Sequence, residues 1–157
     1  MRVLSIVALL ALMAVGCDTE SYVYYRQQPI PTDTWRYGDS LVWDFEVEDT
    51  TRVYTLLLDV AHRTDYPYQN LYYRAYTTYP DGTRLDQVIN TDLLDGAGRY
   101  YGRCDDEACD LRVVLQQRAR FPQVGQYRFG VEQYTRTDAL SGVQSLAFGL
   151  QVVDELE

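Results

Sequence analysis

The chain has 157 residues, 46% of them hydrophobic and 24% charged, a composition that suits one folded domain and excludes a disordered chain. All 14 basic residues are arginine, and 23 acidic residues bring the formal net charge to −9. This balance argues against nucleic-acid binding, which needs a basic face, and against electrostatic attraction to anionic lipid.

Residues 1–16 have the pattern of a signal peptide. Arg2 gives a short positive start, and the apolar run Val3–Val15 ends in small residues. The run is too short to cross a bilayer, which takes about 20 apolar residues. Its junction, Gly16-Cys17, resembles the lipobox of bacterial lipoproteins, in which the cysteine is acylated with diacylglycerol. The alternative is an ordinary secretory signal with a chance cysteine.

Acylation of Cys17 would anchor the protein to a membrane, whereas its negative net charge would not attract it to anionic lipid. Removal of residues 1–16 takes away Arg2 and leaves a net charge of 13 − 23 = −10. Acyl chains contribute about 0.8 kcal/mol per buried methylene, so two or more chains hold a protein on a membrane. We therefore expect membrane attachment through the acyl anchor. Residues 17–38 show no clear periodicity and are expected to form the acylated cysteine and a flexible tether.

After residue 38 the apolar pattern has a period of two. Leu41–Val47 alternates and predicts a half-buried strand. Val53–Val60 is apolar enough for a strand that is covered on both faces. Asn70–Tyr79 predicts a strand rich in tyrosine and threonine, and the Pro-Asp-Gly turn after it returns the chain along Thr83–Ile89.

A loop-like stretch, residues 92–102, leads to the sequence Cys-Asp-Asp-Glu-Ala-Cys between Cys104 and Cys109. An export signal implies an oxidising compartment, so a disulfide is the leading interpretation. A loop this short gains about 2 kcal/mol from the cross-link. The alternative is a metal site that uses both thiolates with the neighbouring carboxylates, although soft sulfurs and hard oxygens suit no single metal well.

Three further strands complete the expected domain, residues 39–157. Leu111–Ala119 fits both helical and strand spacing, and we predict a strand because its neighbours are strands. Tyr127–Val131 and Leu146–Val152 alternate clearly. Seven or so short strands without a convincing helix predict an all-β fold, a two-sheet antiparallel β-sandwich of the jelly-roll or immunoglobulin-like kind.

Little in the sequence predicts catalysis. His62 is the only histidine, has no nucleophile motif around it, and is expected to be a surface or loop residue. Acids such as Asp44, Glu46 and Glu48 on one strand face are typical of a solvated surface. No common nucleotide- or metal-binding motif occurs. We therefore predict no enzyme activity, no cofactor and no metal site.

The surplus of tyrosine is more informative, since the chain has 15 tyrosines against four Phe and two Trp. On the expected strand Asn70–Tyr79, Tyr73 and Tyr79 point to one face, whereas Tyr72 and Tyr76 point to the other. One set is expected to pack in the core. The other either covers an edge or forms a recognition platform for sugars or a protein partner, because tyrosine combines apolar area with a polar tip.

Several fragments keep a fixed order along nearly the whole mature chain. They are Cys17, Trp43-Asp44-Phe45, Tyr66-Pro67 with Asn70-Leu71, Pro80-Asp81-Gly82, Phe121-Pro122 with Gly125–Phe129, Gln133-Tyr134-Thr135-Arg136, and Leu140–Val143 with Gly149-Leu150. In this order and spacing the chain resembles the gliding motility lipoprotein GldH family of Bacteroidetes. Thr135 departs from the family pattern, which typically has methionine before the arginine.

The resemblance implies an envelope lipoprotein of the gliding apparatus, functionally tied to type IX secretion, with envelope proteins as partners and no catalytic residue. We expect it at the outer membrane, facing the periplasm. The candidate partner surface consists of polar and tyrosine side chains of these fragments and of the tyrosine strand: Asn70, Tyr72, Tyr76, Gln133 and Arg136. The alternative function is a lipid-anchored carbohydrate-binding module that uses the tyrosine-rich strand face.

Overall fold

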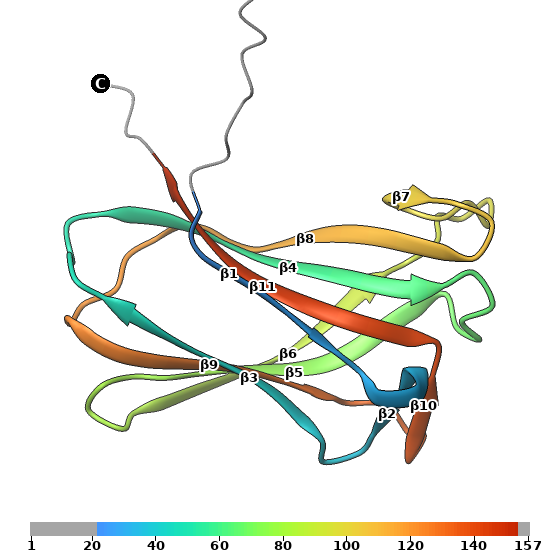
Figure 1. Cartoon of the computed structure of the whole chain (residues 1–157), viewed down its shortest axis with the longest axis horizontal. Coiled ribbons are helices and arrows are strands. Elements are labelled where there is room, and N and C mark those ends of the chain that lie inside the picture. Colours follow the sequence, from blue (N-terminus) through green and yellow to red (C-terminus); the bar gives the residue numbers. More distant parts are fainter. Residues whose placement is uncertain (1–21, 154–157) are drawn as a thin grey trace, which may run out of the picture.

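The computed structural model describes residues 22–153, which form two packed antiparallel sheets and a short two-stranded ribbon (Figure 1). The first sheet has the order β1 (Tyr22–Pro29), β11 (Val143–Val153), β4 (Val53–Arg63), β8 (Ala108–Ala119) and β7 (Arg103–Cys104). The second has the order β3 (Ser40–Val47), β9 (Gly125–Gln133), β5 (Asn70–Thr78) and β6 (Arg84–Asp92). The ribbon pairs β2 (Thr34–Arg36) with β10 (Ala139–Ser141), and a 3-10 helix, η1, spans Pro31–Asp33.

The all-β sandwich predicted from the sequence is confirmed, and so is its hairpin of β5 and β6. These strands pair in uninterrupted register from Asn70 with Asp92 to Thr78 with Arg84. In the turn between them, Gly82 adopts a φ of 84°, and the Asp81 carboxylate accepts the Thr83 N–H at 2.8 Å. Local turn chemistry thus sets the register of this hairpin.

The core lies between the two sheets and is rich in aromatic rings. Alternate residues of β3 point into it, and Trp43 and Phe45 are almost fully buried. The rings of Phe129 on β9 and Phe148 on β11 stack with their centroids 4.2 Å apart, which joins the two layers. Full burial of such a side chain contributes about 1.5–3 kcal/mol. The period-two pattern of the sequence therefore corresponds to the packing between the sheets.

The flexible tether predicted through residue 38 is wrong for residues 22–38. Tyr22–Pro29 is strand β1, which pairs with β11 along the edge of the first sheet. Tyr24 packs against the core, and the buried Trp43 indole donates a hydrogen bond to the Arg26 carbonyl at 2.8 Å. These contacts order the segment although its sequence shows no regular apolar pattern. Cys17 and the rest of residues 1–21 lie outside the described residues.

The two ends of the sandwich differ. At one end, Tyr22 of β1 pairs with Gln151 of β11. At the other end, β1 runs into η1, where the Ile30 N–H donates to the Gln144 carbonyl, and the β2–β10 ribbon follows (Figure 1). We call this second end the ribbon end. Within residues 22–153, no helix has the length and apolar character needed to span a membrane.

Candidate functional site

A cleft of about 740 Å³ opens at the ribbon end of the molecule. Five of its lining residues are tyrosines: Tyr37, Tyr66, Tyr68, Tyr72 and Tyr134. The other five are Asn70, Val88, Thr135, Arg136 and Thr137. We call this site the tyrosine cleft. Its walls come from the segment after β2, the loop between β4 and β5, the outer faces of β5 and β6, and the loop after β9.

The tyrosine rings are held by specific contacts. The Tyr66 hydroxyl donates to the Asn70 carbonyl at 3.1 Å, and the Tyr68 and Thr137 hydroxyls hydrogen-bond at 3.1 Å. The rings of Tyr66 and Tyr68 meet edge to face with centroids 5.8 Å apart. Tyr66 is only 6% exposed, and this burial raises the pKa of its phenol. Tyr66 therefore supports the wall as a neutral group, while Tyr68 presents its ring to solvent.

The structure brings three of the five predicted partner-surface residues together: Asn70, Tyr72 and Arg136 line the cleft. Tyr72 lies on the outer face of β5, opposite to the core face of Tyr73, and is 43% exposed. Arg136 lies in the loop between β9 and β10 and is exposed. Its guanidinium makes no hydrogen bond or ion pair with another described residue, the nearby Asp138 included.

Gln133 is not a surface residue, which corrects the sequence prediction for it. It ends β9 with only 2% of its surface exposed. Its side-chain amide donates to the Thr137 carbonyl at 2.8 Å, and its oxygen accepts the Thr135 N–H at 3.0 Å. The Thr135 hydroxyl donates to the same oxygen at 2.6 Å. Gln133 thus holds the loop that carries Tyr134 and Arg136 and is not itself part of the exposed surface.

Tyr76 is also misassigned by the sequence. It lies on the outer face of β5 but is only 7% exposed, because its ring packs on Gly130 of β9. The Arg84 guanidinium covers the other side of the ring, 3.7 Å from its centroid. A Cβ at position 130 would collide with the ring, so the glycine makes this packing possible. Tyr72 and Tyr76 therefore do not form a shared exposed platform.

The core set of strand tyrosines behaves as predicted. Tyr73 is fully buried, and its hydroxyl hydrogen-bonds to that of Thr91 at 3.1 Å. Tyr79 packs against the core with its ring edge-on to Tyr127. The exposed cleft tyrosines outside β5 come from segments that sequence reasoning did not connect. The sequence feature that could have indicated these residues is a cluster of tyrosine with proline next to the end of a strand, as in Tyr66-Pro67-Tyr68.

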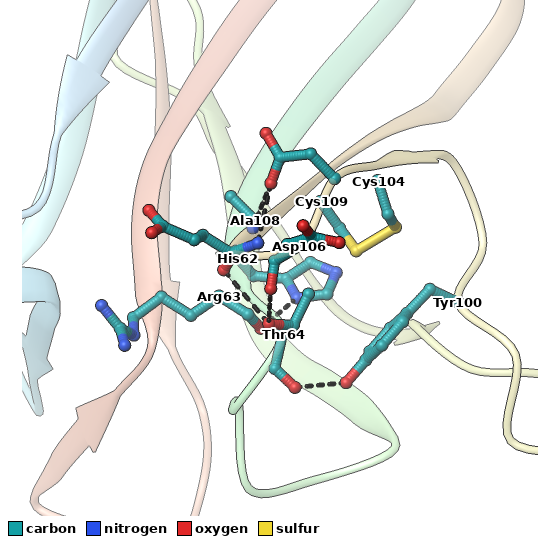
Figure 2. Close-up of a disulfide and its surroundings, with 10 residues drawn as sticks. His62, Arg63, Thr64, Tyr100, Cys104, Asp106, Ala108 and Cys109 are labelled. Atoms are coloured by element: carbon teal, nitrogen blue, oxygen red, sulfur yellow. Dashed lines mark hydrogen bonds between the residues drawn. A yellow bond between two sulfur atoms is a disulfide. The ribbon is translucent and has the colours of Figure 1, made fainter.

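A disulfide joins Cys104 and Cys109 beside the cleft wall, in the pairing that the sequence favours (Figure 2). The loop that it closes contacts Thr64, whose N–H donates to the Glu107 carbonyl at 3.0 Å and whose hydroxyl donates to the Asp106 carbonyl at 3.1 Å. The closed loop is thereby attached to the segment that carries the cleft tyrosines 66 and 68.

His62 is buried, which corrects the prediction of a surface or loop residue. It lies on β4 with 0% exposure, and its ring centroid is 6.0 Å from that of Tyr66 and 5.7 Å from that of Tyr100. Figure 2 shows His62 with Tyr100 and the disulfide. Its Nδ1 lies 2.9 Å from the Arg63 carbonyl, and its Nε2 has no hydrogen-bond partner among the described residues. His62 lines neither the tyrosine cleft nor the larger hollow on the other sheet.

That hollow, about 1040 Å³, lies over the outer face of the first sheet, and the charged groups at its centre pair with one another. The Arg112 guanidinium contacts both Asp59 oxygens at 2.8 and 3.0 Å, and the Tyr25 hydroxyl donates to Asp59 at 2.9 Å. Residues 22–153 contain no cluster of three or more His, Cys, Asp or Glu suited to a metal ion. The tyrosine cleft is therefore the stronger candidate site.

Fold and site define the class of this chain: an all-β sandwich with a tyrosine-lined cleft at one end. Comparison of sequences identifies the family. The family model described as GldH lipoprotein matches residues 22–152, and the chain belongs to this family.

Two curated relatives agree with that assignment. The chain is 26% identical over 134 residues to the gliding motility lipoprotein GldH homolog of Christiangramia forsetii, covering 83% of this chain and 80% of the relative. It is 20% identical over 156 residues to the gliding motility lipoprotein GldH of Flavobacterium johnsoniae, covering 95% and 96%. A solved structure of infectious bursal disease virus Gx strain has a TM-score of 0.33 and 14% identity over 98% of this chain and 37% of the viral chain, too distant to carry an argument.

Proposed function

We propose that this chain is a non-catalytic lipoprotein of the cell envelope that supports assembly or stability of the gliding and type IX secretion machinery. Membership of the GldH lipoprotein family is the observation that carries the proposal. The names of the two relatives, both gliding motility lipoproteins, support it. The tyrosine cleft supplies the docking surface for an envelope protein partner, because tyrosine and arginine are the residues that dominate binding interfaces.

The proposed anchor is the acylated Cys17, at the outer membrane facing the periplasm. Only four residues separate Cys17 from Tyr22, where β1 begins, so a fully extended linker spans no more than about 18 Å. The anchored end of the sandwich therefore stays close to the lipid surface. Strand β1 has eight residues and leads about 25 Å away from that end toward the tyrosine cleft. This arrangement directs the cleft away from the membrane and toward soluble parts of partners.

A motility and fractionation experiment tests the proposal. In cells that lack the native gene, wild-type protein is expected to restore gliding, to incorporate an alkyne analogue of palmitate and to fractionate with the outer membrane. A Cys17→Ser variant is expected to lose the label and the membrane association. Co-purification of the wild-type protein from detergent-solubilised envelope is expected to retain gliding or secretion components. Normal gliding without the gene, or recovery of a free monomer alone, would contradict the proposal.

A second candidate function is carbohydrate binding by the same lipid-anchored domain. The observation that favours it is the set of exposed rings in the cleft, where Tyr68, Tyr72 and Tyr134 combine apolar faces with hydroxyl groups. A glycan array probed with the lipidated protein tests it, and a Tyr72→Ala variant is the control. Retention of defined glycans that is lost in the variant supports this function, and an array without retention excludes it.

A further inference from the structure

We infer that the tyrosine cleft binds an acidic peptide segment of a partner protein and that Arg136 takes the carboxylate of that segment. The inference rests on the proposed function, since it names the chemistry of the partner that the cleft accepts. Three features of the described structure carry it: the charge of the cleft, the state of Arg136 and the free edge of β6.

The cleft differs in charge from the rest of the molecule. The chain has 23 acidic residues, yet none of the ten residues that line the cleft is acidic, and Arg136 is the one charged residue among them. An acidic segment is repelled by the surface elsewhere, because the mature chain carries a net charge of −10. The cleft is therefore the place on this face where an acidic segment is attracted, and this contrast provides specificity.

Arg136 is available for a new carboxylate. Several other exposed arginines are already engaged; for example, Arg128 binds Asp44 at 2.7 Å, and Arg84 binds Asp86 at 2.8 Å. Arg26, Arg36 and Arg103 are exposed without such a contact within residues 22–153, but none of them lines the tyrosine cleft. Arg136 makes no such contact within residues 22–153. A guanidinium binds a carboxylate through two parallel N–H donors, a strong and directional contact.

The rings beside Arg136 suit the apolar part of a peptide. Tyr72 and Tyr134 are exposed in the same cleft, and the Arg74 guanidinium holds the Tyr134 ring from one side, 4.7 Å from its centroid. A bound segment that covers these rings excludes water from the Arg136 contact and strengthens it. The structure therefore favours a carboxylate next to an apolar or aromatic residue.

An extended peptide fits better than a saccharide because of β6. Strand β6 pairs only with β5 in its sheet, so the backbone groups along its other edge are free to pair with a further strand. Val88 of β6 lines the cleft, which places this edge beside the binding site. A peptide is able to add to β6 through its backbone while its side chains enter the cleft. A saccharide lacks the regularly spaced N–H and C=O groups that extend a sheet.

A peptide array tests the inference. Full-length lipidated protein in detergent is applied to blocked hexapeptides in which one central position is Glu or Gln and the others vary. The Glu set is expected to be retained about tenfold more strongly than the Gln set. An Arg136→Gln variant is expected to lose this preference. Arg103→Gln is the matched control, since it removes the same charge from an exposed residue of the other hollow.

Equal retention of the Glu and Gln sets would overturn the inference, as would an equal loss in the Arg103→Gln variant. Binding of a galacturonate trisaccharide in the absence of peptide binding would also overturn it and would favour the carbohydrate function instead. Arg136 is exposed and unpaired, so unchanged thermal unfolding of its variant shows that the loss is one of binding. If envelope partners still co-purify while the array shows no preference for Glu, the proposed function stands and this inference falls.

Discussion

Buried polar side chains hold the exposed residues of the tyrosine cleft in position. Gln133 satisfies the Thr135 N–H and the Thr137 carbonyl from beneath the loop between β9 and β10. The geometry of Tyr134 and Arg136, the exposed residues of that loop, therefore depends on one buried amide. The same holds for Tyr66, whose buried hydroxyl binds the Asn70 carbonyl and fixes the opposite wall.

Substitution of Gln133 by methionine tests this dependence. The Gln133→Met variant keeps the volume but leaves the Thr135 N–H without its acceptor. We expect it to lower the free energy of unfolding by about 2 kcal/mol, because an unsatisfied buried group bears its full desolvation cost. Urea denaturation measures the change. A loss below about 0.5 kcal/mol, the range of ordinary surface substitutions, would show that the loop does not need this side chain.

Tyr25 provides a test at alkaline pH. Burial and the hydrogen bond to Asp59 raise the pKa of Tyr25 to about 12, whereas the ordinary value is 10.0. The folded state therefore prefers the protonated phenol. The stability that this preference contributes is complete below pH 10 and is lost as the pH rises through about 12.

NMR titration of ¹³Cζ-labelled tyrosine measures the pKa of Tyr25. An Asp59→Asn variant is expected to lower this pKa toward 10, because the neutral amide oxygen accepts the phenolic O–H more weakly than a carboxylate and does not repel the phenolate. An unchanged titration in the variant would contradict the assigned cause.

Two substitutions of His62 test whether its buried imidazole only fills space in the core or also contributes as a polar group. Its Nε2 lacks a partner in the described structure, and its ring lies near those of two tyrosines. A His62→Phe variant is expected to unfold within about 2 kcal/mol of wild type, since the change removes the unsatisfied Nε2 but also loses the Nδ1 contact with the Arg63 carbonyl and adds a slightly larger ring. A His62→Asp variant is expected to lose about 3 kcal/mol or more, since it buries a carboxyl group. Chemical denaturation measures both, and a severe loss in His62→Phe would reveal a polar role for the imidazole.

At the scale of elements, the disulfide loop supports the cleft through Thr64. The loop between Cys104 and Cys109 contacts Thr64 through two backbone carbonyls, and the Tyr100 hydroxyl donates to the Thr64 carbonyl. Thr64 precedes Tyr66 and Tyr68 in the chain. The disulfide is distant from the cleft residues in sequence, but its loop contacts Thr64, which precedes the cleft wall in the chain.

Removal of the disulfide is expected to loosen that wall. The double variant Cys104→Ser with Cys109→Ser is expected to lower the free energy of unfolding by about 2 kcal/mol. Amide hydrogen exchange should rise in residues 63–70 and stay unchanged in β3, which lies in the other sheet. Unchanged hydrogen exchange in residues 63–70 would show that the disulfide does not stabilise the cleft wall.

Strand prediction succeeded where local chemistry decides the structure. β3 follows its alternation of Leu41 to Val47, and the hairpin of β5 and β6 follows its turn. β1 was missed because it is an edge strand whose side chains are mostly exposed, so its sequence carries little apolar periodicity. Its order comes from pairing with β11, which lies more than a hundred residues away in the chain.

The cleft was only partly predictable for a related reason. Asn70, Tyr72 and Arg136 were singled out, but Tyr37 and Tyr68 belong to segments that only tertiary pairing brings together. The Tyr37 N–H bonds to the Asp138 carbonyl where β2 meets β10, and the Tyr68 hydroxyl bonds to Thr137. No spacing in the sequence encodes these contacts between distant segments.

At the scale of the whole molecule, the proposed anchor and the tyrosine cleft lie at opposite ends of the sandwich. Four residues separate Cys17 from Tyr22, where the sandwich begins, and the tyrosine cleft lies at the ribbon end of the described fold. The acyl anchor that we propose at Cys17 and the cleft without acidic lining residues suit a lipoprotein that holds a partner at a fixed distance from the membrane. The central claim is that this cleft contacts an envelope component of the gliding machinery.

Site-specific photo-cross-linking in living cells tests that claim most directly. Benzoylphenylalanine is placed at Tyr134, in the cleft, and for comparison at Val124, which is 59% exposed and precedes β9 at the opposite end of that strand. The probe at position 134 is expected to form an adduct with an envelope protein required for gliding. Arg136→Gln is expected to abolish this adduct, and the probe at position 124 is expected not to form it. The same adduct from position 124, or none from position 134, would contradict the account.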